Sequence, residues 1–520
     1  MRTVHSHSWL VFAALLACNK PTQTTPPPDD KGDKPVVTTP EPGSSADAKD
    51  AAREKKAEEA AAKRAQLAAL PALPGVSAAK AVKFPVPQVQ TLPNGLELVV
   101  LEDHEVPKVR ISAFVKAGKI YAPADSPALA EFTAQLLGEG TSKRDKATFD
   151  AQVDATGGTI GSAIDDEITA VTADMLARDA AFGFTAVAEQ LMQPALPEGS
   201  VKKIQDLLTQ GIDQQKSSPF GLSSRMAARA IYGEESAYGR PFATPAQIAG
   251  LNREQALAFH QRLYQPGNAM LVVAGDITPA QARKLADKAF GGWAKGQAVP
   301  VPKTKRPEPA KGPVVYIVDR KASAQATILA LVAAPGIGEP GWLQIRVLEQ
   351  LLGGGLSGRL NMVLREQLGL TYGAGAFHNF GYDGGAFYAG GSTKTKSAAE
   401  FTDALLELLR QPGKEALEAV ELRRILSKIS GQFALEVEGI DTVTMKTVQQ
   451  RLFGLAPDFW ERYRSDVESI AGADLQKISK GLLVDQAVQL VVVGRADKLK
   501  KELAGFGEVR IYDLDLKRVE

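Results

Sequence analysis

The sequence predicts an α+β protein of two homologous halves, each an antiparallel sheet packed with helices, preceded by a disordered tether. Apolar β-rich runs alternate with long amphipathic segments, which is typical of sheets covered by helices. The motif QLLG occurs at Gln135–Gly138 and again at Gln350–Gly353, and an apolar strand-like run begins late in each half, at Met270 and at Gln489. These landmarks recur in the same order at nearly the same separation, which indicates a tandem duplication.

Composition limits the possible functions. The chain has 520 residues, of which 44% are hydrophobic, so it can bury the cores of several domains. A formal net charge of +1 gives no reason to expect a nucleic acid partner. A single cysteine excludes an intrachain disulfide, and five histidines make a multi-histidine metal site difficult to assemble.

The first 17 residues predict an export signal. Arg2 precedes the apolar run WLVFAALLA, which is too short to span a bilayer, and the cysteine Cys18 follows it directly. The sequence LLAC resembles the lipobox of bacterial lipoproteins, in which the cysteine is lipidated and becomes the mature N-terminus. An ordinary signal peptide is the alternative. We expect an exported lipoprotein on the periplasmic side of the outer membrane, anchored to the membrane through Cys18.

Residues 18–83 predict a disordered tether, because a Pro/Thr-rich stretch is followed by an Ala/Lys/Glu-rich tract with little to bury. The composition becomes globular at Phe84. We predict a first domain over 84–299, a Pro-rich and charged linker over 300–312, and a second domain over 313–520.

One stretch of the first domain, ALAEFTAQLLGEGT from Ala128 to Thr141, predicts a helix that ends near Gly138. Glu131 and Gln135 are four residues apart, which places both on one face above the apolar residues of the other face. This polar pair either forms a working functional site or remains from a site that has been lost.

Several motifs resemble the pitrilysin/insulinase (M16) superfamily of zinc peptidases, in its short bacterial and processing-peptidase-like branch. The matching segments are LPNGLELVVLEDHEVPKVRISAFVKAG, YGRPFATPAQIAGL, YQPGNAMLVVAGDI and LLGGGLSGRLNMVLREQLGLTYGAGA. The resemblance extends from about Phe84 to Leu514. It implies two homologous α+β halves that pair into clam-like shells.

The resemblance also implies that the zinc site of this family is lost here. Catalytic members carry H-x-x-E-H on the opening helix, where two histidines bind zinc and the glutamate is the general base. The first histidine position holds Glu131, the glutamate position holds Ala134, and the second histidine position holds Gln135. The later glutamate ligand falls at Gln210 or Gly211, so no carboxylate is present there.

We therefore expect no metal and no cofactor in this chain, with zinc in a partner subunit. Glu131 with Asp206 or Asp213 would make a poor oxygen cage for a hard cation. His104 lies in a strand-edge segment, EDHEVP, in which the family often has a histidine without using it as a ligand. His260 and His378 are far from the opening helix in sequence, and a lone histidine is more often structural.

Family members without zinc ligands usually act as the second subunit of a heterodimer, to which they contribute an arginine and a tyrosine that stabilise the oxyanion. The matching pair here is Arg365 and Tyr372, seven residues apart. The alternative is structural, with Arg365 and Glu366 capping a helix and Tyr372 packed in the core. The glycines of LLGGGLSGRL either admit a bound peptide or form a tight turn.

The resemblance implies a catalytically silent subunit that binds peptide as an added strand and pairs with a zinc-bearing M16 chain in a heterodimeric metalloendopeptidase. We expect the peptide to add near Val109–Val115 or Ala386–Gly391. A structural or peptide-binding envelope protein without any role in catalysis is the alternative. The missing ligands exclude an autonomous zinc peptidase.

Overall fold

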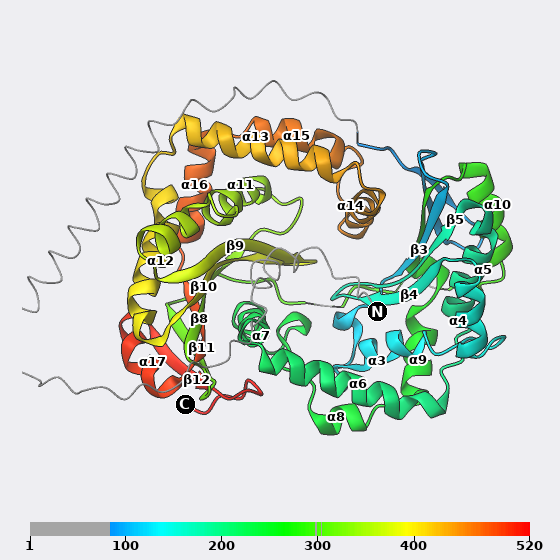
Figure 1. The fold of residues 1–520 in the computed structure, drawn as a ribbon, viewed down its shortest axis with the longest axis horizontal. Coiled ribbons are helices and arrows are strands. Elements are labelled where there is room, and N and C mark those ends of the chain that lie inside the picture. The colour runs from blue at the N-terminus through cyan, green and yellow to red at the C-terminus, as the bar shows by residue number, and fades with distance from the viewer. Residues whose placement is uncertain (1–83, 297–298, 303) are drawn as a thin grey trace, which may run out of the picture.

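The structure is a computed structural model that describes residues 84–296, 299–302 and 304–520. The predicted signal peptide 1–17, Cys18 and the predicted tether 18–83 lie outside the described residues. Two six-stranded sheets, each packed with helices, follow one another along the described chain (Figure 1). The predicted α+β class with two sheet-and-helix halves is therefore confirmed.

The two sheets share one strand order. The first sheet is ordered β1-β2-β6-β3-β5-β4 and the second β12-β7-β11-β8-β10-β9, so β2-β6-β3-β5-β4 corresponds to β7-β11-β8-β10-β9. This equivalence confirms the internal repeat. The strands of the first sheet are β1 (Gln88–Thr91), β2 (Glu97–Glu102), β3 (Lys108–Val115), β4 (Thr159–Ile164), β5 (Thr169–Leu176) and β6 (Ala269–Gly275). Those of the second are β7 (Val314–Asp319), β8 (Gln325–Ala334), β9 (Thr371–Gly381), β10 (Gly384–Lys394), β11 (Gln489–Gly494) and β12 (Glu508–Tyr512).

Both sheets are largely antiparallel, and each also contains parallel pairing. β6 pairs in parallel with β2, and β11 pairs in parallel with β7, which also pairs in parallel with β12. The remaining pairs are antiparallel. The pairs β2–β6 and β7–β11 are parallel because β6 and β11 each return, after a long connection that contains helices, between the first two strands of their repeat.

The prediction that a peptide adds at Val109–Val115 or Ala386–Gly391 is wrong, because neither segment is a sheet edge. Val109–Val115 belongs to β3, which is paired on both sides with β5 and β6. Ala386–Gly391 belongs to β10, which is paired on both sides with β8 and β9. The hairpins β4–β5 and β9–β10 extend each sheet outward, so the edge strands on this side are β4 and β9.

Each sheet is covered on its outer face by helices of its own half (Figure 1). In the first half these are α5 (Ala180–Met192) and α10 (Pro279–Phe290), and in the second α12 (Ala398–Lys414) and α17 (Ala496–Leu503). The other helices are α3 (Leu129–Leu136), α4 (Lys146–Asp154), α6 (Glu198–Ser217), α7 (Pro219–Tyr232), α8 (Pro245–Ala249), α9 (Arg253–Leu263), α11 (Trp342–Gly353), the π-helix Asn361–Gln367, α13 (Ala419–Glu436), α14 (Ile440–Leu452), α15 (Phe459–Glu468) and α16 (Gly472–Leu483).

The halves exchange one helix each across the interior of the molecule. α7 belongs to the first half, yet its buried Leu222 and Met226 pack with Leu329 and Val491 of the second sheet. α14 belongs to the second half and lies against β6 of the first sheet. Ion pairs of α14 fasten it there: Arg451 Nε lies 2.6 Å from Glu97 Oε1 of β2, and Asp441 pairs with Arg110 of β3. The two sheets are therefore joined by buried apolar contacts and by charge.

No helix within the described ranges is both long and apolar enough to cross a membrane.

Candidate functional site

The candidate site is built on α3, and its two polar residues lie as the sequence predicts. Leu129, Phe132 and Leu136 are buried and face the core of the first half. Glu131 and Gln135 are half-buried on the other face, one turn apart. Ala134 is 2% exposed, and its carbonyl oxygen accepts a hydrogen bond of 2.9 Å from Ser162 Oγ of the edge strand β4. α3 therefore lies directly beside an edge strand.

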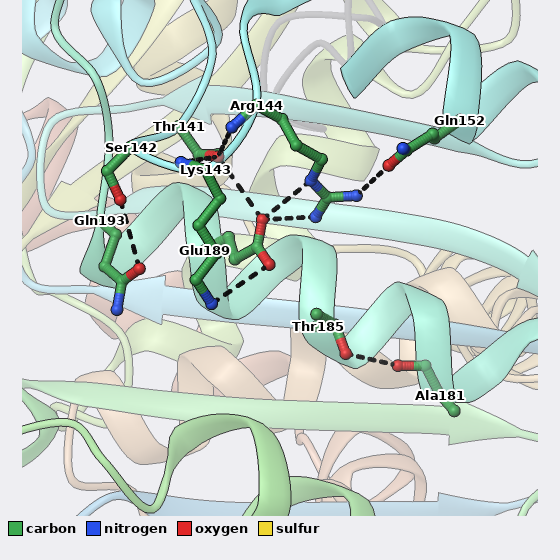
Figure 2. A network of polar contacts seen from close by, with 9 residues as sticks. All are labelled: Thr141, Ser142, Lys143, Arg144, Gln152, Ala181, Thr185, Glu189 and Gln193. Atoms are coloured by element: carbon green, nitrogen blue, oxygen red, sulfur yellow. Dashed lines mark hydrogen bonds and ion pairs between the residues drawn. The ribbon is translucent and has the colours of Figure 1, made fainter. Parts of the chain in front are cut away.

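Polar contacts fix the chain that follows α3. Glu139 accepts hydrogen bonds from Lys203 Nζ (2.8 Å) and Ser200 Oγ (2.8 Å), both on α6. Figure 2 shows the second anchor, in which Glu189 of α5 accepts hydrogen bonds from Arg144 Nε (3.0 Å) and from Thr141 Oγ1 (3.5 Å). Because Glu189 is buried, these charged bonds hold the loop firmly. The end of α3 is thus held by contacts from α5 and α6.

One carboxyl oxygen of Glu131 has no hydrogen-bond partner among the described residues. Oε2 is buried and makes no hydrogen bond to another described group. Burial raises the pKa of Glu131, and the positive charges of Lys119 and Arg225 oppose this only in part. Asp166 raises the pKa further. The site therefore favours a neutral carboxylic acid more than an ordinary surface glutamate does.

The position predicted for the third zinc ligand lies on α6. α3 packs against α6, where Gln210 is exposed and Gly211 is half-buried. Asp206 is exposed and lies 2.6 Å from Lys202 Nζ, so it is engaged elsewhere, and Asp213 is also exposed. Catalytic zinc needs three protein ligands of nitrogen, sulfur or carboxylate type. One carboxylate beside amides does not fit zinc, and no cluster of three His, Cys, Asp or Glu side chains that could hold a metal occurs in the described chain.

The histidines of the described chain serve other local structures. His104 bonds Asp276 (2.6 Å) and Glu102 (2.9 Å), which raise its pKa. His260 is buried against Tyr264, and its Nε2 lies 2.8 Å from Leu191 O. His378 of β9 is 5% exposed, and neither ring nitrogen has a hydrogen-bond partner of good geometry among the described residues. Burial, together with the positive charge of Arg346, lowers its pKa to about 3.

Arg365 and Tyr372 lie in two adjacent irregular elements of the second half. Arg365 is in the π-helix, with its side chain 40% exposed and its Nε 3.5 Å from Glu366 Oε1. Tyr372 is 85% exposed on the edge strand β9, so it does not pack in the core. The structural alternative for Tyr372 is therefore wrong. Both side chains are available to a molecule outside this chain.

Sequence reasoning missed the edge strand β4 and the hydrogen bond from Ser162 that connects it to α3. The only local signal was the small residues of TIGSAI, which are unusual inside a well-covered strand. Strand order, which decides the edges, is not contained in such a local pattern.

Comparison with known proteins places both halves in one family. The family model described as "Insulinase (Peptidase family M16)" matches residues 98–245, and the model described as "Peptidase M16 inactive domain" matches residues 250–429. Together they cover more than half of the chain. The chain is 22% identical over 353 residues to an uncharacterised zinc protease of Bacillus subtilis, YmxG, which is 68% of this chain and 85% of that protein. It is 25% identical over 350 residues to an uncharacterised zinc protease of Mycobacterium leprae, covering 67% and 78% of the two chains.

Solved structures show the same fold at low identity. An M16 inactive domain from Pseudomonas fluorescens superposes with a TM-score of 0.73 at 19% identity, covering 79% of this chain and 98% of that one. A protease from Helicobacter pylori gives a TM-score of 0.71 at 19% identity, with 79% and 99% covered. The first half of the periplasmic protease PqqL from Escherichia coli gives 0.67 at 14% identity, with 81% and 94% covered.

Proposed function

Because the chain belongs to the M16 peptidase superfamily, we propose that it is a catalytically silent subunit that binds peptide and completes the active site of a zinc-bearing M16 partner. One contrast carries this proposal. The helix on which catalytic members place their zinc ligands carries Glu131, Ala134 and Gln135, whereas Arg365 and Tyr372 are both exposed. A chain that has lost the ligands but presents the oxyanion-stabilising pair is suited to act on a substrate held by another subunit.

The two exposed side chains supply hydrogen-bond donors. In the proposed complex, the zinc bound by the partner would supply the chemistry that activates the attacking water. The guanidinium of Arg365 and the hydroxyl of Tyr372 donate to the scissile carbonyl oxygen as negative charge develops on it. Donors that are already oriented stabilise that charge without reorganising at the moment of reaction.

The edge strand β4 is the proposed peptide-binding element. Thr159, Gly161 and Ser162 are exposed, and among the described strands β4 pairs with β5 alone. An edge strand offers free backbone N–H and C=O groups to an extended peptide, which gives affinity with little sequence preference. The strand lies beside α3, so a bound peptide would pass along Glu131 and Gln135.

The proposal places the protein in the cell envelope, as a lipoprotein held through Cys18 on the periplasmic side of the outer membrane. The apolar segment before Cys18 and the LLAC sequence support this location. The likeness to the first half of a periplasmic protease is in keeping with it.

The test begins with purification of the full chain from its native cells, followed by mass spectrometry of what accompanies it. We expect an M16 chain with intact H-x-x-E-H to co-purify, and a peptide library to be cleaved by the mixture at rates that neither chain reaches alone. Stoichiometric zinc and cleavage by the isolated chain would refute the proposal. Peptide binding without such a partner would instead support the alternative, a structural or peptide-binding envelope protein with no role in catalysis.

A further inference from the structure

The segment that carries Arg365 and Tyr372 departs twice from regular structure. Leu368 N donates to Val363 O (2.9 Å), a bond across five residues that widens the helix at Arg365 into a π-helix. In the β9–β10 ladder, Tyr372 and Gly373 together face the single residue Ser392, which makes a β-bulge at Tyr372. Both kinds of irregularity are common at functional sites, where they redirect a side chain.

One buried side chain joins the two irregular elements. Asn361, the first residue of the π-helix, is 1% exposed. Its Nδ2 donates to Ala374 O (2.8 Å) and to Gly355 O (3.0 Å), and its Oδ1 accepts from Ala374 N (2.9 Å). The amide therefore bonds both backbone groups of a residue next to the bulge and also holds the glycine-rich loop.

A second buried side chain fastens the bulge from its other end. Thr371 is 9% exposed; its Oγ1 donates to Ser392 O (2.7 Å) and accepts from Gly373 N (3.1 Å). These are the backbone groups that a bulge leaves out of the regular ladder. A buried backbone group without a partner costs about 1–3 kcal/mol, so Thr371 stabilises the irregular form.

Two glycines let neighbouring elements approach the backbone of β9 closely. A Cβ atom on Gly391 would lie 2.4 Å from Gly373 O, and one on Gly353 would lie 2.0 Å from Ala376 N. β10 and the end of α11 therefore press directly on the backbone of β9. Tyr372 is 85% exposed, although the residues on either side of it in β9 are held by Thr371, Asn361 and β10.

We propose that Asn361 and Thr371 are positioning residues, which hold the π-helix and the bulge at the spacing that presents Arg365 and Tyr372 together to a substrate. This inference rests on the proposed function. Neither residue touches the substrate; each acts through the backbone that carries a donor. A displacement of about 1 Å in such donors can cost on the order of a hundredfold in rate.

The test uses the full chain in complex with its zinc-bearing M16 partner, and measures kcat and KM for one peptide. Asn361→Ala and Thr371→Val should lower kcat about tenfold or more, with KM within about twofold, because the donors act on the transition state. Thr371→Ser keeps the hydroxyl and should restore most of the rate. In the isolated chain, both damaging variants should speed amide exchange over residues 371–376.

Asn268→Ala is the matched control. Asn268 is 3% exposed and its Nδ2 donates to Leu263 O (2.8 Å) and Lys116 O (3.0 Å), far along the chain from the pair. This variant should lose a similar amount of thermal stability and keep kcat. If Tyr372→Phe slows the complex while Asn361→Ala and Thr371→Val keep full kcat, the positioning role is refuted alone. If Arg365→Ala and Tyr372→Phe also keep full kcat, the proposed function is refuted with it.

Discussion

At the scale of single residues, Glu131 occupies the position that the resemblance predicts for the first zinc-binding histidine. Burial raises its pKa, so its carboxyl holds a proton more tightly in the folded than in the unfolded chain. Its contribution to stability is therefore fully present below the ordinary pKa and is lost as pH rises through the folded pKa. We expect Glu131→Gln to raise the melting temperature at pH 8 and to leave it unchanged at pH 4.

Thermal unfolding of both proteins at the two pH values checks this expectation. A fall in melting temperature at pH 8 would show that the ionised carboxylate is stabilised by Lys119 and Arg225, and that burial does not dominate.

His378 gives the folded chain a sensitivity to acid. Its pKa is about 3, mainly because burial disfavours the charged ring, and the ordinary value is 6.5. Since the folded pKa is lowered, stability is complete above pH 6.5 and decreases as pH falls toward 3. Between pH 7.5 and 5.0 this amounts to about 2 kcal/mol of the free energy of unfolding.

Denaturant titrations of His378→Phe should show a correspondingly smaller loss between these two pH values, since the ring packs beside Phe380 and an apolar ring does not titrate. His104→Gln is the control. The pKa of His104 is raised, so this exposed histidine stabilises the fold below pH 6.5 and cannot account for the loss. An unchanged loss in His378→Phe would refute the assignment.

At the scale of elements, α7 couples the halves because it is contributed by one and buried by the other. Met226 is 1% exposed and lies among residues of the second sheet. Met226→Ala should leave a cavity and lower the free energy of unfolding by about 2–5 kcal/mol. It should also speed amide exchange in β8 and β11, although these strands belong to the other half.

Met362→Ala serves as the control, because Met362 is 38% exposed and its truncation should cost little. Hydrogen exchange confined to the first half in Met226→Ala would contradict the coupling.

The elements also show what the sequence could and could not predict. The QLLG motifs mark α3 and α11, and the apolar runs mark β6 and β11, because local periodicity follows from local packing. The parallel pairs, the edge strands and the exchange of α7 and α14 depend on pairings between distant segments, which no local pattern records. The same limit applies to the proposed site, for which the sequence predicted Arg365 and Tyr372 but not the bulge at Tyr372.

At the scale of the whole molecule, the proposed lipid anchor at Cys18 can be tested independently of any enzymatic activity. If Cys18 is lipidated, the protein should sediment with membranes, and Cys18→Ala should release it or leave the signal uncleaved. Lipoproteins carry several acyl chains, and more than one chain is needed for stable anchoring. A soluble mature protein whose N-terminus is elsewhere than Cys18 would refute the anchor.

In the proposed complex this chain lends Arg365 and Tyr372 to a zinc site held by another chain. Turnover of the complex with Tyr372→Phe, measured alongside the melting temperature of the same sample, tests this role. Tyr372 is 85% exposed, so the loss of its hydroxyl should leave stability unchanged. Loss of one oxyanion donor should lower kcat on the order of a hundredfold to a thousandfold, with KM little altered. A kcat equal to that of the wild-type complex would contradict the account.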